Sequence, residues 1–278
     1  SYDGTVQVWD AATGRRLVSY LGHTHSQSGA PVVWSVAWSP TGKQIVSAGN
    51  DQSAQVWDAA SGKLLLTYTG HAMTVHAVAW SPDGKQIATA SYDGTVQVWD
   101  AASGKTLLTY TGHSGQALAV AWSPDGKRLV SAGSDNAPQV WDAASGKTLL
   151  KYQGYAKLAQ SDFQGVGALA WSPTGKQIVS GASTSTAQVW EAASGKTLLT
   201  YRGTNGGVLA VAWSPDGKQI ASAGQYDGMV QVWDASNGQT RSIYRGPSLT
   251  TDALAWAPDG SKLACGSFDR IARVWTPG

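Results

Sequence analysis

The sequence has a single cysteine, Cys265, and no hydrophobic run close to the roughly 20 residues that cross a bilayer. One thiol excludes an internal disulfide and a thiolate-rich zinc site, and it favours a cytoplasmic location. Residues 1–10 lack the basic start and apolar stretch of a secretory signal. The net charge of +2 is too small to gather nucleic acid or an anionic membrane surface. We therefore expect a globular protein without cofactor, metal, nucleic acid or membrane partner.

Phenylalanine is also scarce, with two residues, whereas tryptophan occurs 14 times and glycine 33 times. One tryptophan series ends runs such as TVQVW and comprises Trp9, Trp57, Trp99, Trp141, Trp190, Trp233 and Trp275. A second series lies in AWSPDG or a close variant and comprises Trp38, Trp80, Trp122, Trp171, Trp213 and Trp256. Only Trp34 lies outside both series. The chain is therefore an internal repeat with a period of about 42 residues.

Each repeat contains four short segments in which apolar and polar residues alternate, for example residues 77–80, 85–91, 95–100 and 106–112. The sequences SPDG and AASGK between them are turn sequences, because Pro presets φ and Asp-Gly favours a chain reversal. Each repeat thus predicts a four-stranded antiparallel sheet. Such a sheet has two apolar faces, and radial stacking around an axis buries both. The pattern predicts an all-β propeller and excludes a helical solenoid.

The residues that mark each repeat resemble WD-repeat β-propellers of the highly self-similar bacterial type. Gly-His precedes the first strand, Ser or Thr lies in the second, Asp follows it, and Trp-Asp ends the third. In that family the His, hydroxyl, Asp and Trp form a hydrogen-bonded set within one blade. By position, the resemblance implies three complete sets: His23, Ser47, Asp51 and Trp57; His71, Thr89, Asp93 and Trp99; His113, Ser131, Asp135 and Trp141.

Later repeats depart from this pattern. The corresponding residues are Tyr155, Ser180, Thr184 and Trp190, then Thr204, Ser222, Asp227 and Trp233, then Pro247, Cys265, Asp269 and Trp275. We expect Asp227 and Asp269, left without a histidine, to turn to backbone N–H groups or water. Cys265 is expected to be a buried apolar residue. The Ser–His–Asp trios recur in successive repeats without a nucleophile-elbow motif, which favours structural braces and not catalysis.

The strands do not fill a whole number of blades, because the third strand occurs seven times and the others six. We expect one propeller domain over residues 1–278. Residues 1–22 would supply the third and fourth strands that close the ring, residues 23–246 five complete blades, and residues 247–278 the strands that share the closing blade. Six blades result, or seven if about 30 residues precede Ser1. One third-strand copy, Thr5–Asp10 or Ile271–Trp275, is then surplus and could fray, cap an edge or pair with another molecule.

Partner binding is expected where the repeats stop being identical. The tryptophan spacing rises to 48 residues from Trp9 to Trp57 and to 49 from Trp141 to Trp190, both through insertions before a first strand. The resemblance places these loops on one face, the top. The most variable position lies four residues before the first-strand tryptophan. The candidate partner-binding residues are Trp34, His76, Tyr92, Tyr155, Phe163, Tyr226, Asp252 and Phe268.

The predicted function is a non-enzymatic, cytoplasmic and monomeric scaffold that binds a protein or peptide on the top face. One alternative is a structural or engineered repeat scaffold without ligand, favoured by the identity of residues 1–12 and 91–102. Another is a small-molecule binder or enzyme at the channel mouth, which needs convergent polar groups such as Asp252 and His76. A strand-exchanged oligomer through the surplus third strand is a further option.

Overall fold

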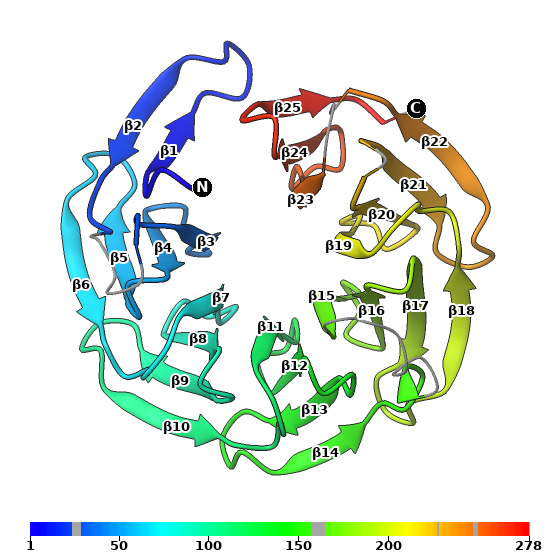
Figure 1. Ribbon diagram of the computed structural model, residues 1–278, viewed down its shortest axis with the longest axis horizontal. Helices are drawn as coiled ribbons and strands as arrows, with labels where there is room; N and C mark the ends of the chain where they lie inside the picture. The colour runs from blue at the N-terminus through cyan, green and yellow to red at the C-terminus, as the bar shows by residue number, and fades with distance from the viewer. Residues whose placement is uncertain (24–28, 157–164, 227, 247–249, 278) are drawn as a thin grey trace. The chain divides into compact units, whose positions relative to one another are not determined.

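The computed structural model describes residues 1–23, 29–156, 165–226, 228–246 and 250–277. They form two compact units, and each is described by itself. The first unit comprises Ser1–Ser131 and Trp141–Thr148, and the second comprises Ala132–Val140 and Leu149–Gly278. The strands of both units are labelled in Figure 1.

The first unit begins with a two-stranded hairpin, which is followed by two four-stranded antiparallel sheets. The hairpin consists of β1 (Val6–Trp9) and β2 (Arg16–Tyr20). The next sheet consists of β3 (Val33–Trp38), β4 (Gln44–Gly49), β5 (Ala54–Asp58) and β6 (Leu64–Tyr68). The third consists of β7 (Val75–Trp80), β8 (Gln86–Ser91), β9 (Val96–Asp100) and β10 (Thr106–Tyr110).

The boundary between the units falls within one four-stranded sheet, β11 (Ala117–Trp122), β12 (Arg128–Gly133), β13 (Gln139–Asp142) and β14 (Thr148–Lys151). The second unit continues with β15 (Val166–Trp171), β16 (Gln177–Ala182), β17 (Thr186–Glu191) and β18 (Thr197–Tyr201). A further sheet consists of β19 (Val208–Trp213), β20 (Gln219–Gly224), β21 (Val230–Asp234) and β22 (Thr240–Tyr244). The last has three strands, β23 (Thr251–Trp256), β24 (Leu263–Ser267) and β25 (Ala272–Trp275).

The turns between the strands form as their residue types predict. In the turn after β7, the Gly84 N–H donates to the Ser81 carbonyl at 2.9 Å, and Gly84 has a φ of +72° that favours glycine. The Ser81 hydroxyl donates to the Asp83 carboxylate at 2.6 Å. After β9, the Asp100 carboxylate accepts hydrogen bonds from the Ser103 N–H and hydroxyl. These local bonds set the register of each hairpin.

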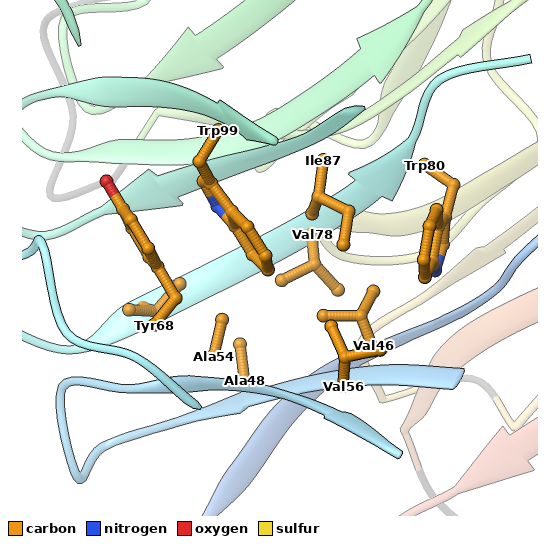
Figure 2. Packing of buried hydrophobic residues seen from close by; sticks show 10 residues of the cluster. Val46, Ala48, Ala54, Val56, Tyr68, Val78, Trp80, Ile87 and Trp99 are labelled. Atoms are coloured by element: carbon orange, nitrogen blue, oxygen red, sulfur yellow. The ribbon is translucent and has the colours of Figure 1, made fainter. Parts of the chain in front are cut away.

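Within each unit, neighbouring sheets pack face to face with their first strands side by side. β3 lies beside β7 and β7 beside β11 in the first unit, and β15 beside β19 and β19 beside β23 in the second. Figure 2 shows Val46 and Val56 of one sheet packed against Val78 and Ile87 of the next. The indole Nε1 of Trp80 also donates across this interface, to the carbonyl of the neighbouring first strand at 3.2 Å. Burial of both faces is the expected source of stability in stacked sheets.

The all-β class and the four-stranded antiparallel repeat are therefore confirmed. Of the two third-strand copies at the ends of the sequence, β1 pairs antiparallel with β2, with Val6 opposite Tyr20, and which copy is surplus stays a prediction. The tight turn after Asp10, closed by a hydrogen bond from the Asp10 N–H to the Arg15 carbonyl, brings these two strands together locally. β25 likewise pairs with β24. The shared closing blade and the single-domain boundaries stay predictions.

Candidate partner-binding site

The most variable position of the repeat lies in a β-bulge of the first strand of the sheet. The pairing of β3 with β4 passes over Trp34, because the strand register shifts between its two neighbours. The same shift occurs in other first strands at His76, Gly167, Leu209 and Asp252. A bulged residue has no cross-strand partner, so its side chain can take a direction of its own. The bulge therefore presents the variable side chains.

Four aromatic side chains of the first unit contact one another in a row, which we call the aromatic ladder: Tyr2, Trp34, His76 and Tyr92. The ring centroids of Trp34 and His76 are 5.1 Å apart with planes inclined at 30°. Those of His76 and Tyr92 are 5.3 Å apart and stacked at 22°. Tyr2 meets Trp34 edge-on at 5.9 Å. Rings at such separations attract one another beyond the area that they bury.

The ladder is most open to solvent at its Tyr2 end. Tyr2 is 59% and Trp34 40% exposed, whereas His76 and Tyr92 are half-buried. His76 Nδ1 lies 2.8 Å from the Leu118 carbonyl, and because a carbonyl only accepts, Nδ1 carries the proton. Burial lowers the pKa of His76, although the bond to Leu118 opposes this effect. The ring is therefore neutral at pH 7, and its Nε2 is a hydrogen-bond acceptor.

A groove of about 470 Å³ opens where the ladder ends, beside Tyr92. It lies between the loops that precede β9 and β11, and its wall includes Asp93, Thr95, Thr111 and Gln116. Asp93 is the acidic residue of this wall, and no Lys or Arg lines it. The groove therefore combines apolar and polar surface and carries one carboxylate.

The other candidate residues do not belong to the ladder. Tyr226 is 82% exposed with a φ of +70°, Phe268 is 51% exposed and Asp252 is exposed, and all three lie in the second unit. Phe163 lies outside the described residues. The prediction that Tyr155 lies on the binding surface is wrong, because its side chain is only 1% exposed. Its hydroxyl contacts the Ser180 hydroxyl at 2.9 Å and donates to the Ser180 carbonyl at 2.8 Å.

Two of the implied hydrogen-bonded sets are complete in the first unit. His23 Nδ1 lies 2.9 Å from the Asp51 carboxylate and Nε2 lies 2.8 Å from the Ser47 hydroxyl. The Trp57 indole donates to the same hydroxyl at 3.2 Å. The set therefore runs from the loop before the first strand, through the second, to the third. We call such a set a brace.

The brace at His71 has the same geometry. His71 Nδ1 lies 2.8 Å from Asp93, Nε2 lies 2.8 Å from the Thr89 hydroxyl, and Trp99 donates to that hydroxyl at 3.3 Å. Burial lowers the pKa of His71, against the opposing effect of Asp93. Burial acts to raise the pKa of Asp93, but hydrogen bonds from Thr95 and His71 outweigh it and the pKa is lowered. The pair is thus a neutral imidazole beside a carboxylate.

In the third set, His113 Nε2 lies 2.8 Å from the Ser131 hydroxyl, to which Trp141 donates at 3.0 Å. Asp135 accepts from the Ala137 N–H and from Gln139 Nε2, both at 3.4 Å. The imidazole, hydroxyl and indole of this set are therefore joined in the predicted order.

Comparison with known families decides the identity of the repeat. The family model for the WD domain, G-beta repeat, matches residues 14–58, 62–100, 104–142, 155–191, 195–234 and 238–276. The chain belongs to the WD-repeat family. The six matched repeats confirm the predicted WD-repeat propeller fold, and β1 precedes the first of them. No curated protein sequence matches the chain.

The later WD repeats keep the hydroxyl–indole contact while changing its surroundings. Trp190 donates to Ser180 and Trp233 donates to Ser222, both at 3.0 Å. In the last repeat the buried Cys265 replaces the hydroxyl, and burial raises the pKa of its thiol. These pairs lie within the second unit.

Asp269 finds a partner that the sequence analysis missed. It accepts the predicted backbone N–H, from Ile271 at 3.1 Å, and also pairs with the Arg273 guanidinium at 2.8 Å. Arg273 stands where the other WD repeats have glutamine before the Val-Trp pair, so this substitution was the available signal. Asp227 lies outside the described residues.

A second network, which also escaped the sequence analysis, couples neighbouring WD repeats. The tyrosine that ends the fourth strand stacks on the third-strand tryptophan of the next sheet, as Tyr68 does on Trp99 with centroids 4.6 Å apart. The Tyr68 hydroxyl also donates to Gln97. Tyr20 does the same to Gln55 at 2.5 Å, and burial followed by the Asp51 charge raises the pKa of Tyr20 to about 12. The recurrence of this Tyr and Gln in successive repeats was its sequence signal.

The described residues contain no group of three or more His, Cys, Asp or Glu side chains that could hold a metal ion. Within the same part of the chain, no helix is long and apolar enough to cross a membrane. In each brace the hydroxyl is buried and accepts a hydrogen bond from an indole N–H. A substrate could therefore not reach this hydroxyl. The geometry of the braces therefore favours a structural role, as is typical of this family.

Proposed function

We propose that this WD-repeat protein is a non-enzymatic platform that binds an extended segment of a partner protein along the aromatic ladder. WD-repeat propellers generally mediate protein–protein interaction, which supports the class of function. The observation that carries the proposal is the row of contacting aromatic side chains with Trp34 at its exposed part. Tyrosine and tryptophan are enriched at interface hot spots because each combines a large apolar area with a polar atom.

The geometry of the rings favours a polypeptide over a sugar or a nucleobase. Sugars and bases stack on free aromatic faces, but Trp34, His76 and Tyr92 direct faces toward one another. What remains for a ligand is ring edges and polar atoms. Trp34 Nε1, His76 Nε2 and the Tyr92 hydroxyl form no hydrogen bond within the described residues. Donors and acceptors spaced along an apolar row suit the alternating N–H and C=O groups of an extended peptide.

The test is a selection of random dodecapeptides displayed on phage against the immobilised protein, followed by affinity measurement of the enriched peptides. Trp34→Ala should weaken binding about 30-fold, the size of a loss at an interface hot spot. Tyr226→Ala is the matched control, since Tyr226 is an exposed aromatic residue outside the ladder. Equal effects of the two substitutions, or no enrichment over an unrelated protein, would contradict the proposal. A monomeric state and a cytoplasmic location remain predictions that accompany it.

A further inference from the structure

The groove beside Tyr92 has a chemistry that the ladder lacks. We infer that it receives an arginine or lysine side chain of the partner segment, an inference that rests on the proposed function of the ladder. The groove continues the ladder directly, because Tyr92 stacks on His76 and also lines the groove wall. A segment lying along the ladder would therefore place its next side chain in the groove.

The charge of the groove selects a cation. Asp93 keeps its negative charge at neutral pH because its pKa is lowered, while its partner His71 stays neutral because burial lowers the imidazole pKa. The brace thus leaves one uncompensated negative charge at the groove wall. No Lys or Arg lines this wall, and the His113 imidazole that also lines it contacts the Ser131 hydroxyl through Nε2. An acidic side chain would be repelled there, and a basic one attracted.

The carboxylate of Asp93 is held in a fixed orientation, which favours recognition. One oxygen accepts from His71 at 2.8 Å and from the Ala72 N–H at 3.1 Å, and the other accepts from the Thr95 N–H and hydroxyl. The Asp93 side chain nevertheless keeps 12% of its surface exposed. A guanidinium or ammonium group can therefore approach an oriented charge without a large rearrangement.

The remaining groove residues fit the rest of a basic side chain. The volume of about 470 Å³ accommodates one long side chain. The hydroxyls of Thr95 and Thr111 and the amide of Gln116 supply polar partners for its N–H groups. Arginine fits these features best because its planar group carries five donors.

The experiment extends the peptide selection with variants of the groove. Among the enriched dodecapeptides we expect Arg or Lys at one fixed position, and replacing that residue by Gln should weaken binding about tenfold. Asp93→Asn should weaken the basic peptide by a similar factor while leaving its Gln counterpart unaffected. Asp51→Asn is the matched control, because Asp51 has the same place in the brace at His23 and does not line the groove.

A second variant avoids the brace. Gln116→Lys adds a positive charge at an exposed groove residue and should weaken the basic peptide selectively. The inference is overturned, and the ladder proposal kept, if enriched peptides depend on Trp34 but show no basic preference or ignore both groove variants. Loss of binding in Asp51→Asn equal to that in Asp93→Asn would also overturn it. Peptides that bind without dependence on Trp34 would contradict the ladder proposal itself.

Discussion

The sheets β7–β10 and β15–β18 place the same hydroxyl–indole pair in the same position and support it in different ways. In the first sheet an imidazole, held by Asp93, reaches the hydroxyl of Thr89. In the second sheet the phenol of Tyr155 reaches Ser180 directly, and Thr184 stands where the first sheet has its carboxylate. One neutral side chain thus replaces a titratable pair. The repeat that departs from the His and Asp pattern therefore keeps a brace, in which the phenol of Tyr155 is the neutral donor.

The difference shows why the two substitutions in the second sheet belong together. A carboxylate without its imidazole would be a half-buried charge with one partner fewer, whereas a phenol supplies its own donor and needs no carboxylate. Burial raises the pKa of Tyr155, so this hydroxyl keeps its proton at every pH at which the protein would be studied. The sheet with Tyr155 therefore has no counterpart of the Asp93 carboxylate, because Thr184 stands at that position.

The largest expected effect on stability is that of removing the Tyr155 side chain. Tyr155→Ala removes a ring that is fully buried and stacked edge-on against Tyr152, and should lower the free energy of unfolding by about 4 kcal/mol. His71→Ala should cost less, about 2 kcal/mol, because Asp93 keeps its bonds to Thr95. Urea denaturation followed by tryptophan fluorescence measures both. A larger loss in His71→Ala would reverse the comparison.

Transplanting the phenol brace sharpens the comparison. His71→Tyr alone should destabilise the protein by about 2 kcal/mol, because it leaves Asp93 without its imidazole partner. Adding Asp93→Thr should restore at least about 1 kcal/mol of this loss. A double-mutant cycle with the two single variants measures the coupling. Strictly additive losses would show that the two positions do not act as a unit.

A smaller effect is expected from removing the phenol oxygen alone. Tyr155→Phe keeps the ring and loses the bonds to Ser180, which should cost about 1 kcal/mol. The Ser180 hydroxyl still receives the Trp190 indole in this variant. Unchanged unfolding in urea would show that packing, and not the hydroxyl, supports this sheet.

The smallest expected effect is a pH dependence of the unfolding free energy, which the imidazole brace should contribute and the phenol brace should not. The folded-state pKa of His71 lies below its unfolded value of about 6.5, so the unfolded chain binds more protons as the pH falls below that value. Stability is therefore lost from about pH 6.5 downward until the folded pKa is passed. The variant with His71→Tyr and Asp93→Thr should lose less stability between pH 7.5 and 5.5 than the unmodified protein. If the variant and the unmodified protein lose stability equally over this pH range, His71 is not a source of the pH dependence. His76 contributes to the loss in the same direction in both proteins, because burial also lowers its pKa.

The sequence predicted the repeat and the strands because each is local or periodic, and the resemblance to WD-repeat propellers implied the braces. The alternation in residues 85–91 and the turn chemistry of SPDG act over a few residues, and the copies confirm one another. The role of Tyr155, which stands in place of the brace histidine, was harder to predict. Only the packed structure shows that its phenol reaches the Ser180 hydroxyl. The same holds for Arg273, which reaches Asp269 from a position that elsewhere carries Gln.

The ladder could be predicted only in part. Trp34, His76 and Tyr92 were named for their variability and aromatic character, but their contact depends on the bulges, which a two-residue period does not reveal. Tyr2 was missed although residues 1–12 repeat residues 91–102, which makes Tyr2 the copy of Tyr92. Copies of one residue thus lie at both ends of the ladder.

The bulges have a consequence for how this protein could change. The strand pairing passes over residues 34, 76, 167, 209 and 252. Substitutions at these positions are therefore expected to leave the register of the paired strands unchanged. If the proposed function holds, substitutions at positions 34 and 76 would change the specificity of binding while the strand pairing stays as it is. A combinatorial library confined to these positions would sample new specificities with little loss of foldable members.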